Sequence, residues 1–199
     1  MHDVARKILP LLLVGLLALV VGVWASLQIS KEAVVQTRAV TVLSSPRALP
    51  EFQMVGKDGE PAGREVFYGK WSLVFMGFTS CGHICPTKMA EMRMIQAQTD
   101  APLNIVFVSV DPSRDTPAVI KQYVESFDPD FYGMTGSAAA IEIFANGLGA
   151  PYFVDPSPDR YIVDHSSALF LIGPNASLVG TITPPLDIAV ITDDLGKVF

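Results

Sequence analysis

The stretch WSLVFMGFTSCGHICP, residues 71–86, decides the fold, and it contains both cysteines of the chain, Cys81 and Cys85. Its first part, residues 71–77, is mostly apolar and rich in aromatic and β-branched side chains, which predicts a buried strand. Residues 86–98 contain few helix-breaking residues and predict a helix. The two cysteines are therefore expected on a strand-to-helix turn.

A turn that leads into a helix favours negative charge, because free backbone N–H groups and the positive end of the helix dipole lie there. At least one of the two thiols should therefore have a lowered pKa and a substantial thiolate fraction. A thiolate is both a nucleophile and a soft metal ligand. The turn therefore predicts either redox chemistry or metal binding.

The spacing of the cysteines leaves both roles open. Residues at i and i+4 on a helical turn have Cβ atoms roughly 5–6 Å apart, whereas a relaxed disulfide needs ~3.5–4.5 Å. A metal ion can bridge that gap, and a disulfide can form after a local adjustment of the turn. Thioredoxin-type redox motifs have two intervening residues, and this chain has three. A structural zinc site usually has four protein ligands, so a metal site here needs at least one further ligand.

Half of the 199 residues are hydrophobic, which is enough for one well-cored domain and a small additional element. That element is the uncharged stretch of residues 8–29. About 22 residues at ~1.5 Å rise cross a ~30 Å hydrocarbon layer, so the stretch predicts a transmembrane helix. The alternative is a cleaved signal peptide, but its apolar core would be only about 7–15 residues long and a small-x-small cleavage site would follow.

Charges that flank this stretch predict its orientation. Arg6 and Lys7 form a tight cluster before it, whereas Lys31 and Arg38 follow it farther apart. The positive-inside rule then places residues 1–7 in the cytoplasm. We therefore expect a single-pass protein of the inner (cytoplasmic) membrane whose soluble domain lies on the periplasmic side. In that oxidising compartment an unprotected cysteine pair tends to form a disulfide.

The remaining sequence predicts one folded domain, residues 50–199, after a membrane-proximal linker of mixed polarity, residues 30–49. Residues 103–110 form a continuous apolar run typical of a buried parallel strand. Thr116-Pro117 is a typical helix start, an N-cap followed by proline. Alternating strands and helices predict an α/β domain with a central, partly parallel sheet. The expected strands are residues 51–55, 64–67, 71–77, 103–110, a short one near 131 and a pair within 152–183, and the expected helices are residues 86–98, 117–127, 137–146 and 186–198.

The net charge of the chain excludes one class of partner. The formal net charge is −6 and no basic stripe appears in the sequence. Nucleic-acid binding depends on clustered basic side chains that neutralise phosphates. We therefore expect no nucleic-acid partner.

Histidines are the candidates for the missing ligand, and the chain has three of them, His2, His83 and His165. His2 precedes the predicted membrane span, on the opposite side from the cysteines. His83 lies between the cysteines and can point outward from the same turn. His165 lies just before an apolar strand, close to the expected functional edge of the sheet, so we favour it as a ligand over a purely local role in a loop. Two thiolates and one imidazole suit Cu(I) and can hold Cu(II), and the open fourth position equally suits Zn(II).

Three blocks of sequence in this order resemble the Sco/SenC family of membrane-anchored, thioredoxin-like copper proteins. The blocks are FTSC-x-x-x-CP at residues 78–86, VDP-x-RDTP at residues 110–117, and Y-x-VDHS at residues 161–166 with the following strand that ends in Gly173-Pro174. The resemblance extends from about residue 46 to the end. It implies a thioredoxin-like domain with a central mixed sheet flanked by helices, and it implies that Cys81, Cys85 and His165 are the copper ligands.

The resemblance also implies a task, which is delivery of copper, as Cu(I) or Cu(II), to the binuclear copper centre of cytochrome c oxidase, or reduction of that centre's cysteines before metallation. The implied partner is that oxidase subunit or another copper or thiol carrier protein. One departure stands out, because such proteins often have proline after the first cysteine and then an acidic residue, whereas this chain has Gly82 and His83. His83 is neutral or positive near pH 7, so it either tunes the thiolates, offers another ligand or does neither.

Residues near the cysteines have two interpretations each. Asp111 follows a buried strand directly, so it is a candidate for a hydrogen bond to a copper ligand. The alternative is a surface ion pair with Arg114, worth at most ~1 kcal/mol. Three methionines on the predicted helix could bind copper, but we expect thioethers there to fill gaps in the core. They are Met89, Met92 and Met94.

Three functions of different classes follow from these residues. A copper metallochaperone would use both cysteines and His165. A thiol-disulfide oxidoreductase would use Cys81 as the attacking thiol and Cys85 as the resolving thiol, and it would not need the histidine. A thioredoxin-like peroxidase would need an activating arginine and threonine, and the spacing from Thr79 to the cysteine is unconvincing. Copper binding is favoured, because only metal binding requires an imidazole.

Overall fold

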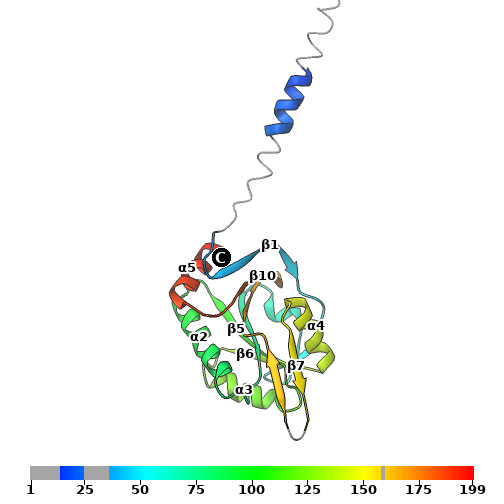
Figure 1. The fold of residues 1–199 in the computed structure, drawn as a ribbon, viewed down its shortest axis with the longest axis vertical. Helices are drawn as coiled ribbons and strands as arrows, with labels where there is room; N and C mark the ends of the chain where they lie inside the picture. Colours follow the sequence, from blue (N-terminus) through cyan, green and yellow to red (C-terminus); the bar gives the residue numbers. More distant parts are fainter. Residues whose placement is uncertain (1–13, 25–35, 158–159) are drawn as a thin grey trace, which may run out of the picture. The chain divides into compact units, whose positions relative to one another are not determined.

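The computed structural model describes residues 14–24, 36–157 and 160–199 (Figure 1). The chain divides into two units, Met1–Val34 and Val35–Phe199, and each is described by itself. In the first unit, residues 14–24 form a helix whose side chains are exposed. Over the described residues, no helix has the length and apolar character needed to cross a membrane. Residues 8–13 and 25–29 of the predicted span lie outside the described residues.

The second unit is built on an eight-stranded mixed sheet with strand order β1-β10-β9-β4-β5-β6-β2-β3. β4, β5 and β6 are parallel to one another, and the other pairs in the sheet are antiparallel. These strands are β1 (Val40–Ala48), β2 (Met54–Gly56), β3 (Pro61–Ala62), β4 (Trp71–Gly77), β5 (Leu103–Ser109), β6 (Tyr132–Thr135), β9 (Leu169–Gly173) and β10 (Ser177–Ile182). A separate two-stranded sheet pairs β7 (Tyr152–Asp155) with β8 (Ile162–His165).

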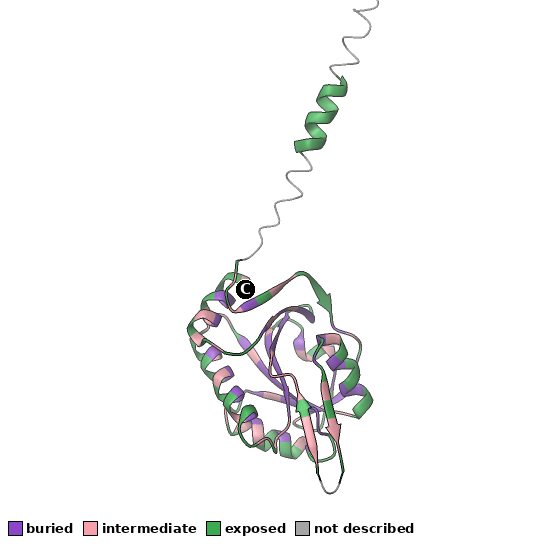
Figure 2. Cartoon of the chain, in the orientation of Figure 1, coloured by how far each residue is buried: buried purple, intermediate pink, exposed green. Residues whose placement is uncertain are grey.

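Helices cover both faces of the large sheet (Figure 1). They are α2 (Ile84–Gln98), α3 (Pro117–Glu125), α4 (Ala138–Leu148) and α5 (Ile188–Val198). Successive strand residues point to opposite faces, so β4 contributes to two cores. Val74 packs in the core that includes α4, and Phe75 packs in the core that includes α2, α3 and α5. Figure 2 shows the resulting layers, with buried strands between helices whose outer faces are exposed. The predicted mixed sheet flanked by helices is therefore confirmed.

The strongest sequence patterns are confirmed residue by residue. β4 has the predicted bounds, and β5 ends one residue before the predicted end and is parallel to β4. Thr116 caps α3, because its side chain accepts a hydrogen bond from the backbone N–H of Val119. On α2, Met89 and Met92 are fully buried as predicted, but Met94 is 48% exposed, so the core prediction is wrong for Met94.

The strand predicted for residues 64–67 is wrong, since Arg64–Phe67 is a 3₁₀ helix and the partner of β2 is the shorter strand β3. Gly59 adopts a positive φ of 86°. Glycine tolerates this backbone conformation best, because it has no Cβ atom. The backbone N–H of Gly56 donates to the carbonyl of Glu60 at 2.8 Å. The chain therefore reverses within this tight turn, and the return strand begins directly after it.

The linker predicted for residues 30–49 is wrong over Val40–Ala48, which form the edge strand β1 of the large sheet. β1 pairs with β10, with a register shift between Val42 and Arg47. Such an irregularity breaks the alternation of buried and exposed residues by which a strand is predicted. The strand therefore has the mixed polarity of a linker.

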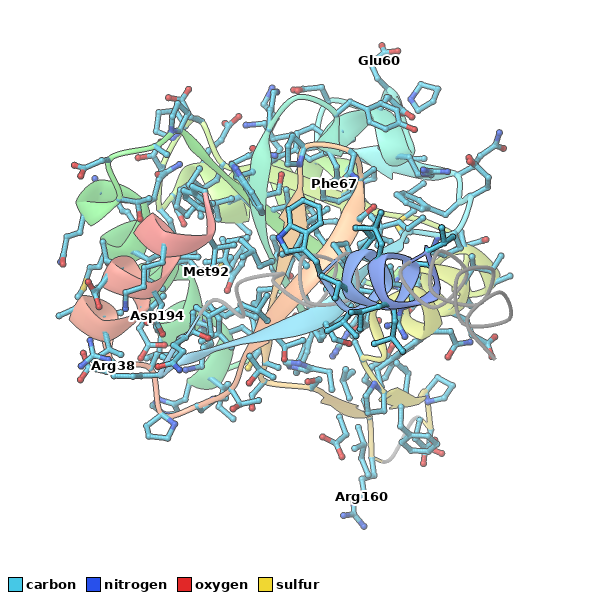
Figure 3. All side chains as sticks on the ribbon, turned by 90° about the horizontal axis from the view of Figure 1, so that it is seen from above. Arg38, Glu60, Phe67, Met92, Arg160 and Asp194 are labelled. Carbon is cyan, nitrogen blue, oxygen red and sulfur yellow. The ribbon has the colours of Figure 1, made fainter. Side chains whose placement is uncertain are left out.

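A buried carboxylate fixes the start of β1. Oδ2 of Asp194, on α5, accepts hydrogen bonds from the backbone N–H groups of Arg38 and Ala39, each at 2.7 Å, and of Val40 at 3.2 Å. Arg38 and Asp194 lie side by side in Figure 3. This contact joins residues that are more than 150 positions apart in the sequence.

Candidate metal centre

Three chain segments bring the predicted ligands to one end of the sheet. The loop between β4 and α2 carries Cys81, the first turn of α2 carries Cys85, and β8 ends in His165. Sγ of Cys85 lies 3.5 Å from Nε2 of His165, although 80 positions separate them in the sequence. The fold therefore brings the cysteine turn and the predicted third ligand together.

Cys85 is the buried member of the pair, with no exposed surface. A Cβ atom on Gly77 would lie 3.0 Å from Sγ of Cys85, so the missing side chain at the end of β4 leaves room for this sulfur. Burial raises the pKa of Cys85 to about 12, and the hydrogen bond and charge of Cys81 add to the rise, while a hydrogen bond to the backbone of Phe78 opposes it. Cys85 is therefore a protonated thiol at neutral pH.

Cys81 is the accessible member of the pair. Burial opposes its ionisation, but hydrogen bonds with the backbone and thiol of Cys85 and with the backbones of His83 and Ile84 outweigh burial, so the pKa of Cys81 is lowered. The backbone N–H of Cys85 donates to Sγ of Cys81 at 3.3 Å. This is the stabilisation of negative charge at a helix start that the sequence predicts. Both cysteines are free thiols.

His165 turns Nε2 of its ring toward Cys85. Its Nδ1 lies 3.0 Å from the carbonyl oxygen of Ser166, and a carbonyl can only accept, so Nδ1 is the donor in this hydrogen bond. Nε2 is therefore the ring nitrogen that is available to bind a metal ion. The rings of Phe75 and Phe78 contact the imidazole edge to face, with centroids at 5.6 and 5.8 Å. These contacts fix the tautomer and limit rotation of the ring, as is usual for a metal-ligating histidine.

The donor set fits a soft metal ion. Metal–sulfur and metal–nitrogen bonds of ~2.3 and ~2.1 Å, the lengths found with zinc, place two ligands about 3.6 Å apart at a tetrahedral angle. The 3.5 Å between Sγ of Cys85 and Nε2 of His165 matches this separation. In the described part of the chain, no three His, Cys, Asp or Glu side chains are grouped closely enough to hold a metal ion. Cys81 must therefore rotate or its turn must move before all three ligands can converge.

Among the described residues, no hydrogen bond joins the side chain of His83 to these ligands, although its backbone contributes to the lowered pKa of Cys81. His83 is the exposed N-cap residue of α2, and its side chain accepts no capping hydrogen bond. Its carbonyl oxygen accepts a hydrogen bond from the hydroxyl of Thr87 at 2.9 Å. Its side chain is thus free to meet an approaching molecule.

Asp111 makes no hydrogen bond to the predicted ligands in the described structure, contrary to expectation. Its buried carboxylate accepts from the hydroxyls of Tyr161, at 2.6 Å, and Ser113, at 2.8 Å, and from the guanidinium of Arg114, at 2.5 Å. Burial opposes ionisation of Asp111, but these three hydrogen bonds prevail and lower its pKa. The alternative of a surface ion pair is also wrong, because Asp111 is buried.

Asp115, which the sequence analysis did not single out, supports the cysteine loop instead. Its carboxylate accepts from the hydroxyl of Thr79 at 2.6 Å, from the backbone N–H of Thr79 at 2.9 Å, and from the hydroxyl of Ser109 at 2.5 Å. Asp115 is 1% exposed, and its charge contributes to the raised pKa of Cys85. Asp111 and Asp115 follow the same strand, and no local pattern distinguishes their partners. The hydroxyl of Thr79 is thereby engaged by a carboxylate, which further weakens the peroxidase hypothesis.

A family model described as SCO1/SenC matches residues 41–199 of the chain. The chain belongs to the SCO1/SenC family. One relative is the "Putative copper-binding protein" of Stutzerimonas stutzeri, which is 35% identical over 81% of both chains. Another is the mitochondrial SCO2 homologue of Bos taurus, which is 32% identical over 77% of this chain, and this chain spans 61% of that protein.

Solved structures of SCO1/SenC proteins have the same fold. The structure of Arabidopsis thaliana ScoI with copper bound has 30% sequence identity and a TM-score of 0.69, and the match covers 75% of this chain and 96% of that one. BsSco, described as a member of the Sco family of cytochrome c oxidase assembly proteins, has 21% identity and a TM-score of 0.61 over 79% of this chain and 97% of that one, and its likeness shows the fold alone. The domain therefore has the thioredoxin-like α/β fold that the resemblance implied. Its family contains copper-binding proteins.

Proposed function

We propose that this protein is a copper metallochaperone that binds one copper ion through Cys81, Cys85 and His165. It delivers that ion to the binuclear copper centre of cytochrome c oxidase, or prepares that centre for metallation. The observation that carries the proposal is the approach of Nε2 of His165 to within 3.5 Å of Sγ of Cys85. A metal site requires an imidazole lone pair beside its sulfur ligand, and the copper stoichiometry of His165→Ala distinguishes this role from that of a base for the buried thiol.

The ligand set also suits a transferable ion. Two sulfurs and one imidazole are soft donors that accept Cu(I) and tolerate Cu(II). Three protein ligands leave a coordination position through which a thiolate or imidazole of a partner protein can bind before the ion leaves. The half-exposed position of Cys81 gives such a partner access. Copper bound to a relative of this fold supports copper as the cargo.

The location belongs to the same proposal. Residues 8–29 anchor the chain in the inner (cytoplasmic) membrane, and the domain faces the periplasm, where the copper-centre subunit of the oxidase, or another copper or thiol carrier protein, can be reached. The uncharged sequence of residues 8–29 and the basic cluster that precedes it support this placement.

The test is copper stoichiometry of the full chain, reduced and loaded anaerobically with Cu(I). We expect one tightly bound copper per chain, and its loss in Cys81→Ser, Cys85→Ser and His165→Ala. His83→Ala is the matched control, because this exposed histidine lies between the two cysteines and should leave binding unchanged. Tight binding that survives His165→Ala would rule out the three-ligand site.

Thiol-disulfide exchange is a second candidate function, favoured by the opposite pKa shifts of the two thiols. The Cys81 thiolate attacks a partner disulfide, forms a mixed disulfide and releases one partner thiolate. Cys85 transfers its proton to the partner thiolate released in the first step, and its own thiolate then attacks the sulfur of Cys81 and releases the second partner thiolate. The partner gains two electrons, and this chain ends with a Cys81–Cys85 disulfide.

His165→Ala separates the two functions. In a pure oxidoreductase, the native chain reduces a disulfide-bonded model peptide and binds no copper specifically. In a metallochaperone, the native chain binds copper and the variant does not. Cys81→Ser is the control that stops the exchange reaction in either case.

A further inference from the structure

Asp111, Arg114 and Tyr161 form a side-chain cluster that joins two segments of the chain far apart in sequence. Asp111 and Arg114 follow β5, and Tyr161 directly precedes β8, the strand that ends in His165. The hydroxyl of Tyr161 donates to Oδ1 of Asp111 at 2.6 Å. The guanidinium of Arg114 binds Oδ2 of the same carboxylate and lies over the ring of Tyr161, 3.8 Å from its centroid. The hydrogen bonds of the Asp111 carboxylate therefore join Tyr161 to the turn after β5.

The hairpin of β7 and β8 depends on such contacts for its position. Within the described residues, no strand pairing connects either strand to the eight-stranded sheet. Tyr152 and Val163 pack against the core at the base of the hairpin but are only partly buried. A two-stranded hairpin is marginally stable by itself. The placement of His165 therefore rests largely on side chains that tie the hairpin to the domain.

The cluster also reaches the cysteine loop. Arg114 lies 5.7 Å from the ring centroid of Phe78, the first residue after β4 on the way to Cys81. The ring of Phe78 in turn contacts the imidazole of His165 edge to face. The guanidinium of Arg114 thus lies against Tyr161, which directly precedes the strand of His165, and near the loop that carries Cys81. An arginine in this position offers planar stacking and a fork of N–H donors, which a lysine does not.

We propose that Asp111, Arg114 and Tyr161 are positioning residues that hold His165 at ligand distance from Cys85. One part of this inference rests on the proposed function, namely that the cluster controls how long copper stays bound. The inference does not rest on that function for its geometry, because the contacts of the cluster are made by side chains of this protein alone. Loss of the cluster loosens the hairpin, displaces the imidazole and leaves the two cysteines in place.

Tyr161→Phe tests the cluster, since it removes the hydroxyl that binds Asp111 and Ser113 and keeps the ring that stacks on Arg114. Groups that orient a metal ligand typically affect metal affinity by about 10–100-fold, so we expect Cu(I) affinity to fall at least about tenfold in the full chain. Tyr152→Phe is the matched control on the other strand of the hairpin, where the hydroxyl makes a 3.4 Å contact to Ala138. It should leave the affinity unchanged.

A second measurement does not involve copper. The ring protons of His165 lie against Phe75 and Phe78, so their NMR shifts in the reduced, metal-free chain report the position of the imidazole. We expect Tyr161→Phe to move or broaden these signals, Arg114→Lys to do the same, and Tyr152→Phe to leave them alone.

The outcomes separate this inference from the proposed function. Signals displaced in Tyr161→Phe in a chain that binds no copper would uphold the cluster and reject the metallochaperone. Native signals and native affinity in Tyr161→Phe would overturn the inference, even if the melting temperature fell. Displaced signals with native copper affinity would also overturn it, because the position of the imidazole would then not control the ion.

Discussion

At the scale of single residues, the two thiols of one helical turn are held in different states. Cys81 is accessible and has a lowered pKa, whereas Cys85 is buried and has a pKa raised to about 12. Only one of the two sulfurs is therefore a ready nucleophile near neutral pH. An incoming copper ion also meets one thiol whose lowered pKa favours ionisation and one thiol whose raised pKa opposes the loss of its proton on binding.

This difference predicts selective alkylation of the reduced, metal-free chain. At pH 8 the lowered pKa of Cys81 increases its thiolate fraction, while Cys85 stays protonated because the solution is far below its pKa of about 12. Iodoacetamide should therefore modify Cys81 first, as read by peptide mass spectrometry. The Cys81→Ser variant is the control and should remain almost unmodified. Equal rates at the two positions would contradict the assignment.

The residues of the site were predictable to different degrees. Both cysteines and His165 are the scarce soft donors of the chain, and scarcity alone narrows the choice. The distinction between Asp111 and Asp115 was not predictable. Both follow β5, and their partners, Tyr161 and Thr79, come from distant segments that only the folded chain brings near. A hydrogen bond between segments that are distant in sequence depends on tertiary structure, so the pattern of residues along the chain carries little information about it.

At the scale of elements, Asp194 is the residue that joins the first strand to the last helix. The carboxylate accepts three backbone N–H groups at the start of β1, and α5 holds it in a buried position. Burial opposes its ionisation, but the hydrogen bonds from Ala39, Arg38 and Val40 prevail and lower its pKa to about 2. The ionised form is therefore the one that stabilises this junction.

Asp194→Asn should lower the free energy of unfolding by about 1–3 kcal/mol, because a neutral amide accepts these N–H groups more weakly than a carboxylate. Asp193→Asn is the matched control on the same helix turn. Its ion pairs with Arg38 and Lys197 are exposed and screened by solvent, so they should contribute much less than the buried contacts of Asp194. Urea denaturation at pH 7 measures both. Equal effects of the two substitutions would contradict the role given to Asp194.

The same pair of variants has a predicted pH dependence. The pKa of Asp194 in the folded chain is about 2, below its ordinary value of 3.8. Its contribution to stability is therefore fully present above about pH 4 and is lost as the pH falls through about 2. The stability gap between the native chain and Asp194→Asn should close over this range. A gap that stays constant down to pH 2 would show that the carboxylate charge is not involved.

At the scale of the whole molecule, the sequence predicts the centre of the sheet far better than its edges. β4 and β5 are long, apolar and buried on both faces, so their composition alone predicts that they are central strands. β1 is an irregular edge strand and β3 has only two residues. Neither therefore has the alternation of apolar and polar residues by which a strand is predicted from sequence. The predicted domain boundary at residue 50 falls after β1 for this reason, whereas the folded unit includes β1 (Val40–Ala48).

The corrected boundary gives a prediction about where the domain can be cut. A fragment of residues 50–199 lacks β1 and should unfold at a lower urea concentration than a fragment of residues 36–199. It loses Val40 and Leu49, each 2% exposed, and burial of such side chains contributes about 1.5–3 kcal/mol apiece. It also leaves Asp194 without its N–H donors and exposes the edge of β10 to other chains. We therefore expect the shorter fragment to associate on size-exclusion chromatography and the longer one to remain monomeric. Equal urea midpoints for the two fragments would mean that β1 adds nothing to the domain, and that the folded unit begins where the sequence pattern alone places it.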